Sequence, residues 1–387
     1  MRQVRWASGT VALAMAVALG SVGPAAGDVA SDRSAAIVIW PHVQVGAVAE
    51  PLGLNEVVDT VIQLSNTSLD PIVVHCFYLN ANSHCTNTGQ VCISAGECCD
   101  TPSAGCGVCR PDWNEVDFHI RLTPRQPIGW LASEGLTDFP LDGVSRSANT
   151  GSCRNAPCSN AGSRIPPVPE DPFEGELKCI AVDEDGVPVA RNDLKGEATL
   201  YNADKDLAAP FVDVAKYSAV GIQAIPDGVN DDNILRLGGE EAEFNGCPNV
   251  LILNHFCDFA ENPVTGAEIT TNLVLVPCTE DLLHQIPGSA VIQYLTFNEF
   301  EQRFSTSRTA TCKQNLQLSL IDTTQPTRSI FSCGVSGTLT AQTRATAIGS
   351  GMLAIADEFH DNGDVFSADF NVHFQGDRED GDIITLP

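Results

Sequence analysis

Six cysteines lie within 25 residues of this chain, and their close spacing is the clearest indication of chemistry in the sequence, namely disulfide formation or metal binding. They are Cys85, Cys92, Cys98, Cys99, Cys106 and Cys109. Almost no apolar side chains separate them, so this segment cannot form a hydrophobic core and requires disulfides or a metal. Cys106 and Cys109 have the spacing of half a zinc site, but no second CxxC pair follows about 15–20 residues away. We therefore expect disulfides, with metal binding as the alternative.

Carboxylates near the C-terminus form a second candidate site. The segment ADEFHDNGDVFSAD contains Asp357, Glu358, Asp361 and Asp364. Calcium prefers carboxylate and carbonyl oxygens, and Gly363 would allow a turn between such ligands. The spacing does not match an EF-hand loop, and the competing interpretation is an acidic tail that keeps the chain soluble. A structural calcium ion is the only cofactor that the sequence suggests.

Two glutamates are candidates for catalysis on carbohydrate. In a strand, Glu299 and Glu301 would point to the same side about 7 Å apart, a separation that suits glycoside hydrolysis. The alternative interpretation is a solvated strand or turn face, with Arg303 as an ion partner. The secreted hydrolase that these glutamates would serve is the second functional hypothesis.

A histidine and an aspartate three residues apart are candidates for a base and the residue that orients it. His255 and Asp258 follow an apolar run, and the alternative is a buried, hydrogen-bonded histidine at the end of a strand. The sequence contains no GxSxG, HExxH, P-loop or dinucleotide-binding motif. A non-catalytic function is therefore favoured.

The N-terminal residues predict secretion. Arg2 and Arg5 precede a short apolar run, and small residues lead to Gly27, so residues 1–27 have the pattern of a signal peptide. The run is shorter than the roughly 20 residues that span a bilayer, and no later run has that length. We therefore expect a secreted or periplasmic protein without a membrane span, in which most of the 15 cysteines form disulfides.

The cysteine count also predicts a free or intermolecular thiol, because 15 is odd. If the six clustered cysteines pair with one another and Cys153 pairs with Cys158, seven remain, and Cys76 is the one expected to be unpaired. The seven are Cys76, Cys179, Cys247, Cys257, Cys278, Cys312 and Cys333. An intermolecular bond from this thiol would suit a third hypothesis, an envelope assembly component.

The charge of the chain limits its partners. The 49 acidic and 21 basic residues give a formal net charge of −28. Nucleic acid and anionic membranes repel such a surface and are not expected to bind. An extracellular protein or a carbohydrate is the expected partner.

Short strands account for most of the sequence. Residues 115–123 alternate apolar and polar side chains, with Val116, Phe118, Ile120 and Leu122 on one face. His119 lies on the opposite face, where solvent exposure explains it better than catalysis. Residues 57–65 and 72–79 are rich in β-branched and aromatic residues and are separated by turn residues.

The segment VIQLSNTSLDPIVVHCFY resembles strand pairs in the immunoglobulin-like domains of secreted bacterial surface proteins. This resemblance implies a fold class and no activity. The predicted fold is all-β: an antiparallel immunoglobulin-like sandwich followed by a second, larger β-sandwich-type region. The cystine-rich segment is predicted to be a loop inserted between two strands.

The predicted domain organisation follows from changes in composition. Residues 35–140 form the first sandwich, with the cystine-rich insertion at 85–109. Residues 141–175, rich in Gly, Ser, Asn and Pro, read as a linker that contains Cys153 and Cys158. Residues 176–387 form the second β domain, which ends in the acidic tail. The favoured function is extracellular binding, adhesion or structural support without catalysis, with the inserted loop as the contact surface.

Overall fold

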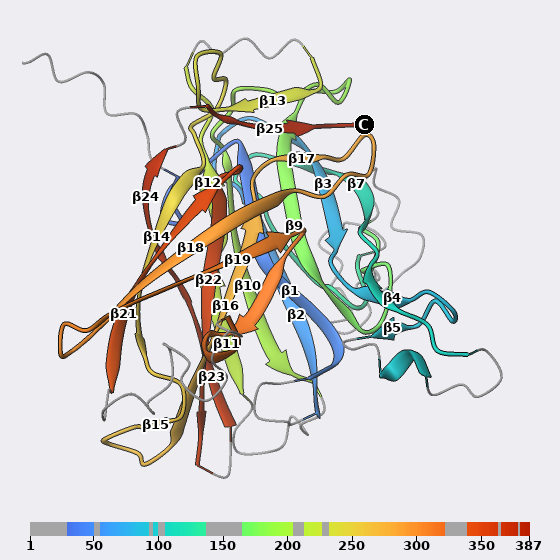
Figure 1. Ribbon diagram of the computed structural model, residues 1–387. Helices are drawn as coiled ribbons and strands as arrows, with labels where there is room; N and C mark the ends of the chain where they lie inside the picture. Colours follow the sequence, from blue (N-terminus) through green and yellow to red (C-terminus); the bar gives the residue numbers. More distant parts are fainter. Residues whose placement is uncertain are drawn as a thin grey trace, which may run out of the picture.

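The computed structural model describes residues 29–49, 55–92, 96–99, 105–136, 165–203, 213–226, 232–321, 339–362, 365–377 and 380–387. The fold is all-β, as predicted, and is built of antiparallel sheets (Figure 1). No helix among these residues has the length and apolar character needed to cross a membrane. The predicted signal peptide, Cys153, Cys158, Cys333 and Asp364 lie outside the described residues.

Nine strands of the described chain form the first sandwich. They are β1 (Ile37–Ala49), β2 (Asn55–Asn66), β3 (Ile72–Asn80), β7 (Asn114–Leu122), β8 (Pro127–Leu131), β9 (Phe173–Val182), β10 (Leu194–Asn202), β11 (Val214–Ser218) and β12 (Val220–Ile222). Their order is β11-β10-β2-β1-β9-β3-β7, with β12 paired to β1 and β8 paired to β2. The first part of β1 pairs with β9 and its end pairs with β2, so this strand links the two halves of the sandwich.

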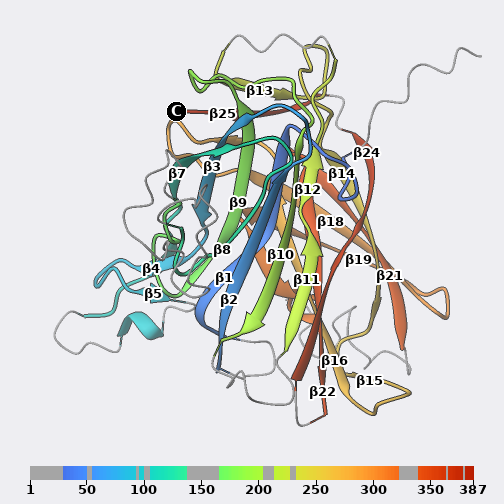
Figure 2. The same ribbon diagram turned by 180° about the vertical axis from the view of Figure 1, so that it is seen from behind.

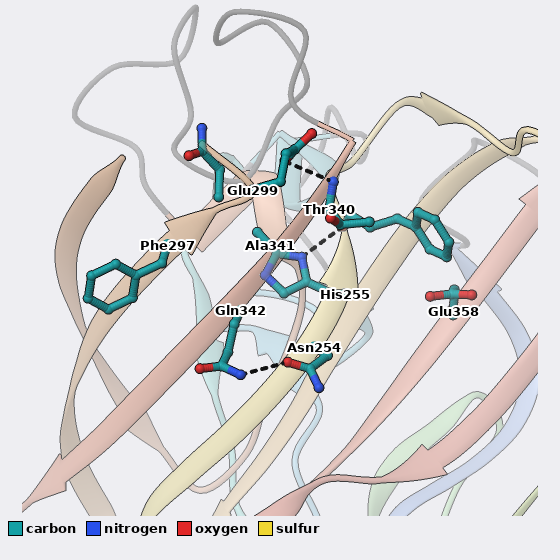
Figure 3. Close-up of a pocket in the computed structure, with 10 residues that line it drawn as sticks. Asn254, His255, Phe297, Glu299, Thr340, Ala341, Gln342 and Glu358 are labelled. Carbon is teal, nitrogen blue, oxygen red and sulfur yellow. Dashed lines mark hydrogen bonds between the residues drawn. The ribbon is translucent and has the colours of Figure 1, made fainter. Parts of the chain in front are cut away.

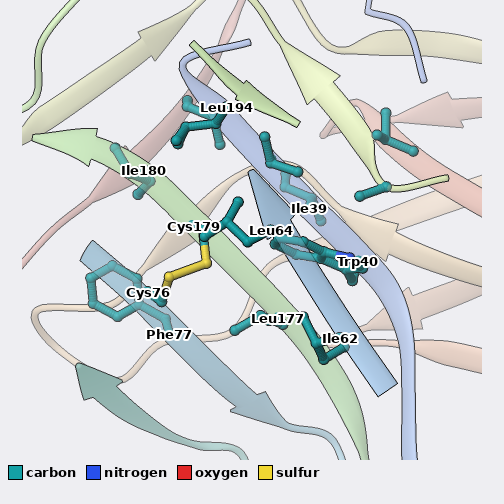
Figure 4. Packing of buried hydrophobic residues seen from close by; sticks show 14 of the residues in the cluster. Ile39, Trp40, Ile62, Leu64, Cys76, Phe77, Leu177, Cys179, Ile180 and Leu194 are labelled. Carbon is teal, nitrogen blue, oxygen red and sulfur yellow. A yellow bond between two sulfur atoms is a disulfide. The ribbon is translucent and has the colours of Figure 1, made fainter. Parts of the chain in front are cut away.

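Large apolar side chains from both halves fill the first core. Trp40 of β1 packs with Ile62 of β2 and Leu177 of β9, and all three are fully buried (Figure 4). Gly196 of β10 permits this packing, because a Cβ at that position would lie 2.1 Å from the Trp40 ring. On β7 the predicted alternation is correct: Phe118 is buried and His119 is exposed.

Ten further strands of the described residues form a second sandwich. One sheet contains β14 (Pro248–Phe256), β18 (Ser289–Asn298), β19 (Arg303–Thr311), β21 (Thr340–Ile348) and β24 (His373–Asp377), in the order β19-β18-β21-β14-β24. The other contains β15 (Ala260–Glu261), β16 (Glu268–Pro277), β20 (Gln314–Gln317), β22 (Met352–Asp361) and β23 (Val365–Asn371), in the order β15-β16-β22-β23 with β20 beside β16. The short helix α1 (Leu318–Ile321) packs into the same core.

The sheet of β16 and β22 is buried on both faces. Leu273 and Leu275 of β16 point into the second core, whereas Val274 and Val276 point into the first. This arrangement explains the uninterrupted apolar run in β16, since a strand with water on one face would alternate. The two sandwiches therefore share a middle layer, seen between the outer sheets in Figures 1 and 2.

Two small sheets complete the described structure. One joins β13 (Ile234–Leu237), β25 (Asp382–Thr385) and β17 (Glu280–Asp281) at one end of the molecule. The other contains β4 (Ser83–Cys85), β5 (Val91–Cys92) and β6 (Cys109–Pro111), next to the single-turn helix η1 (Glu97–Cys99). This second sheet belongs to the cystine-rich segment, which is inserted between β3 and β7.

The predicted boundary between the two domains was wrong. The strand β9 begins at Phe173, near the end of the predicted linker, and lies between β1 and β3 in the first sandwich. Strands β10, β11 and β12 also belong to this sandwich. The change in composition at 141–175 does not separate two domains, because β8 before it and β9 after it belong to the same sandwich. Composition does not reveal which distant strands pair with each other.

The expected free thiol was also misplaced. Cys76 forms a disulfide with Cys179 between β3 and β9, and the free cysteine among the described residues is Cys312. Burial raises the pKa of the Cys312 thiol, and nearby carboxylates raise it further. This thiol is only 6% exposed, so it is poorly placed for the intermolecular bond that the assembly hypothesis requires.

Candidate functional site

A pocket at one end of the second sandwich is lined by β14, β18 and β21 of one sheet and by Glu358 on β22 of the other. Its volume is about 530 Å³, within the range of small-ligand pockets (Figure 3). The turn that follows β18 closes one side of it. Its lining includes Asn254, His255, Phe297, Glu299, Gln342 and Glu358. His255, Glu299 and Glu358 are among the residues predicted from the sequence, whereas Asn254, Phe297 and Gln342 are not.

Three of these side chains form one row across three strands. Phe297 of β18 is the cross-strand partner of Gln342 on β21, which is the partner of Asn254 on β14. The Gln342 Nε2 donates a hydrogen bond of 2.9 Å to Asn254 Oδ1. Because the two amides orient each other, they present a fixed donor and acceptor beside the half-exposed Phe297 ring. Such a row can recognise a ligand that has both hydroxyl groups and an apolar face.

The two glutamates of the hydrolase hypothesis do not converge. Glu299 accepts backbone hydrogen bonds from Leu339 at 2.6 Å and from Thr340 at 3.3 Å. Partial burial opposes the charge on Glu299, but these hydrogen bonds outweigh it and lower its pKa, which does not suit a general acid. Glu301 is exposed in a turn, with a φ of +60°, and does not line the pocket. The expected strand ends at Asn298, so the alternation that would align the two carboxylates is absent.

His255 and Asp258 do not form a base and its orienting group either. The Nδ1 of His255 donates to the Phe256 carbonyl at 2.7 Å, and Nε2 accepts from the Thr343 hydroxyl at 2.8 Å. Burial lowers the pKa of His255 to about 4, so its ring is neutral at pH 7. Asp258 instead accepts backbone hydrogen bonds from Thr271 and Ser319. Both residues support the strands around them.

The predicted calcium ligands are also divided by the strand geometry. Asp357 and Glu358 are neighbours on β22, so their side chains point to opposite faces. Asp357 is buried toward the first sandwich, whereas Glu358 lines the end pocket and accepts a hydrogen bond from His360 at 2.7 Å. Asp361 lies at the far end of β22. The structure does not bring Asp357 and Glu358 together as ligands of one ion.

A buried and an exposed histidine form a pair in the first sandwich. His75 of β3 and His119 of β7 are cross-strand partners whose rings stack 4.0 Å apart, and His75 contacts Asp117 at 3.0 Å. The rings are nearly parallel, with an angle of 20° between them. An imidazole nitrogen binds metal in the plane of its ring, so parallel rings do not direct their lone pairs at one ion. The exposed setting of His119 matches the interpretation from sequence.

The six clustered cysteines pair only with one another. The disulfides are Cys85–Cys98, Cys92–Cys109 and Cys99–Cys106. None of these bonds reaches the main sheets, so the segment is an inserted loop with its own cross-links. Elsewhere Cys247 pairs with Cys278, and Cys257 is also disulfide-bonded.

Comparison of the chain with protein-family models, with curated proteins and with solved structures found no match. Function must therefore be argued from the chemistry of the sites described above.

Proposed function

We propose that the protein is a secreted, non-catalytic binding protein that holds a carbohydrate in the end pocket of the second sandwich. The observation that carries this proposal is the row of Phe297, Gln342 and Asn254 along the pocket. Sugars combine hydroxyl groups, which pair with amides, and apolar faces, which pack on aromatic rings. The immunoglobulin-like character of the first sandwich, suggested by its strand sequence, is part of the same proposal.

Several features support binding rather than hydrolysis. The oxygens of Glu299 are engaged by backbone amides, and Glu358 is bonded to His360. Neither carboxylate is supported as an acid or nucleophile at a glycosidic bond, where two carboxyl groups must act together. The disulfides and the predicted signal peptide support an extracellular setting, where such a ligand is available.

The proposal is tested by probing the purified protein against an array of oligosaccharides, followed by calorimetric titration with the best ligand. Phe297→Ala and Gln342→Ala should each weaken binding roughly tenfold, which corresponds to about 1.4 kcal/mol. Gln293→Ala is the matched control, because Gln293 lies on the same exposed face of β18 but outside the pocket. This control should bind like the wild type.

Two outcomes would overturn the proposal. One is the absence of any glycan that binds, and the other is a glycan whose affinity is unchanged by both pocket variants. Release of new reducing ends from the bound glycan would instead favour the hydrolase hypothesis. Glycan binding that is unchanged by both pocket variants but lost when residues 86–108 are removed would instead place recognition on the inserted loop.

A further inference from the structure

Three buried residues meet where the first sandwich packs against the shared middle sheet. His42 belongs to β1, Asp357 to β22 and Asp369 to β23. One ring nitrogen of His42 and one oxygen of each carboxylate all lie within 4.8 Å of one another. His42 is 1% exposed and Asp357 is 5% exposed. The cluster therefore combines parts of the chain separated by more than 300 residues.

His42 has a fixed position but an unsatisfied ring. Its backbone N–H donates to the Tyr217 hydroxyl at 3.1 Å, and the same hydroxyl donates to its carbonyl at 2.6 Å. Neither ring nitrogen makes a hydrogen bond of normal geometry, although the Gln44 side chain lies close by. A buried polar group without a hydrogen-bond partner destabilises the folded state, so two unpaired nitrogens on one side chain require an explanation. A neutral imidazole nitrogen carries the lone pair that binds a metal ion.

The two aspartates add negative charge in the same buried place. One oxygen of Asp357, Oδ1, lacks a hydrogen-bond partner. Two carboxylates this close repel each other unless a proton or a cation lies between them. A cation would compensate both charges and use the His42 lone pair as well.

A small cavity lies beside the two aspartates. Its volume is about 20 Å³ and its lining includes Asp357, Asp369, Asp213 and Gln44, whereas His42 reaches the two carboxylates from outside this lining. This volume is sufficient for a single water molecule or metal ion. Asp213 is held by the backbone and hydroxyl of Ser367, so a third carboxylate lies at the edge of the cavity.

We infer that His42, Asp357 and Asp369 bind one divalent transition-metal ion, of the Zn²⁺ or Mn²⁺ type, between the two sandwiches. The donor set of one imidazole nitrogen and two carboxylates suits these ions. Calcium fits less well, because it takes oxygen ligands and the histidine would contribute nitrogen. The ion would connect β1 to β22 and β23 and thereby fasten the first sandwich to the second. This inference is independent of the proposed carbohydrate binding.

Metal binding to the full chain provides the test. The purified protein is stripped with a chelator and titrated separately with Zn²⁺, Mn²⁺ and Ca²⁺, with bound metal measured after equilibrium dialysis. About one Zn²⁺ or Mn²⁺ per chain should bind and raise the unfolding temperature, because the site exists only in the folded state. X-ray absorption of the zinc form should show nitrogen and oxygen ligands without sulfur. This spectrum tests the donor set even if a variant fails to fold.

Variants then locate the ion. His42→Gln and Asp369→Asn should each weaken binding roughly tenfold or more. His119→Gln is the control, because it alters the surface histidine pair and should leave the affinity unchanged. The inference is overturned if no Zn²⁺ or Mn²⁺ binds, if Ca²⁺ binds more tightly than both, or if sulfur ligands appear. It is also overturned if His119→Gln removes the ion while Asp369→Asn retains it.

Discussion

His255 shows how burial determines the protonation of a single side chain in the end pocket. Its two ring nitrogens are bonded to the Phe256 carbonyl and the Thr343 hydroxyl, and the neutral ring satisfies both partners with one donor and one acceptor. Burial lowers its pKa from 6.5 to about 4. Between these two values the unfolded chain binds the proton and the folded chain does not, so the free energy of unfolding falls as the pH falls.

We predict that His255→Gln removes much of this acid sensitivity. The wild type should lose about 3 kcal/mol more of its unfolding free energy than the variant does between pH 7 and pH 4. Urea unfolding at several pH values measures the difference. His284→Gln, at an exposed position, should keep the wild-type pH profile. Parallel pH profiles for the wild type and His255→Gln would contradict the prediction.

Among the larger elements, the cystine-rich loop is cross-linked only within itself. Cys85 and Cys109 face each other in the pairing of β4 with β6, so the chain enters and leaves the loop at adjacent positions. By contrast, the disulfide Cys76–Cys179 joins two central strands and closes 103 residues of chain. The stability of the first sandwich should therefore depend on the disulfide Cys76–Cys179 and not on the disulfides within the cystine-rich loop.

We predict that residues 86–108 can be replaced by an Asn-Gly turn, with Cys85 and Cys109 changed to serine, without loss of the fold. Such a two-residue turn suits an antiparallel pair of this register. The unfolding free energy should change by about 1 kcal/mol or less, because no contact of the main core is removed. Replacing Cys76 and Cys179 by alanine should instead cost about 4 kcal/mol. Calorimetric unfolding of the two variants compares these effects, and a larger loss in the loop variant would refute the argument.

Local features of the fold could be predicted from sequence. The alternation in β7 is visible because one face meets water and the other meets the core. The turn between β2 and β3 is also predictable, since β2 ends at Asn66 and β3 begins at Ile72 around turn residues. Glu299 and Glu301 lie in an exposed turn, which is the alternative that the sequence offered to a catalytic pair, because β18 ends at Asn298.

The candidate sites could not be predicted, because they depend on pairing between distant strands. Asn254 and Gln342 meet only because β14 pairs with β21, which lies 88 residues further along the chain. Asp357 was identified as a possible ligand, but its neighbours in sequence point elsewhere, and His42 reaches it from the first sandwich. Sequence periodicity indicates which face a side chain occupies, but not which strand lies opposite that face.

At the scale of the whole molecule, a buried ionic cluster connects β9 of the first sandwich to β17 of the small end sheet, in addition to the shared middle sheet that connects the two sandwiches. Lys178 of β9 is fully buried and pairs with Glu280 of β17, while Glu176 lies 3.9 Å away. Burial opposes the charge on Lys178, but the two carboxylates outweigh it and raise its pKa. Burial and the adjacent Glu280 raise the pKa of Glu176 well above its ordinary value. Lys178 is therefore the buried cation that compensates Glu280, while the raised pKa of Glu176 favours its protonated form.

We predict that Lys178→Met destabilises the whole protein. The methionine fills the space but removes the cation that pairs with Glu280, so the unfolding free energy should fall by about 3–5 kcal/mol at pH 7. The loss should shrink as the pH is lowered, because protonation of the Glu280 carboxyl group removes the uncompensated charge. Denaturant unfolding at pH 7 and pH 5 measures both effects.

Lys216→Met is the matched control for this prediction. Lys216 pairs with Glu197 at 2.6 Å, but its side chain is 51% exposed, so water replaces the ion pair when the charge is removed. The control should lose about 0.5 kcal/mol or less, with little dependence on pH. β9 belongs to the first sandwich and β17 to the end sheet. If only Lys178→Met loses unfolding free energy by the expected amount, the charge cluster stabilises the contact between the first sandwich and the end sheet. Equal losses in the two variants, or a loss in Lys178→Met that is the same at both pH values, would show that the cluster contributes no more than a surface ion pair.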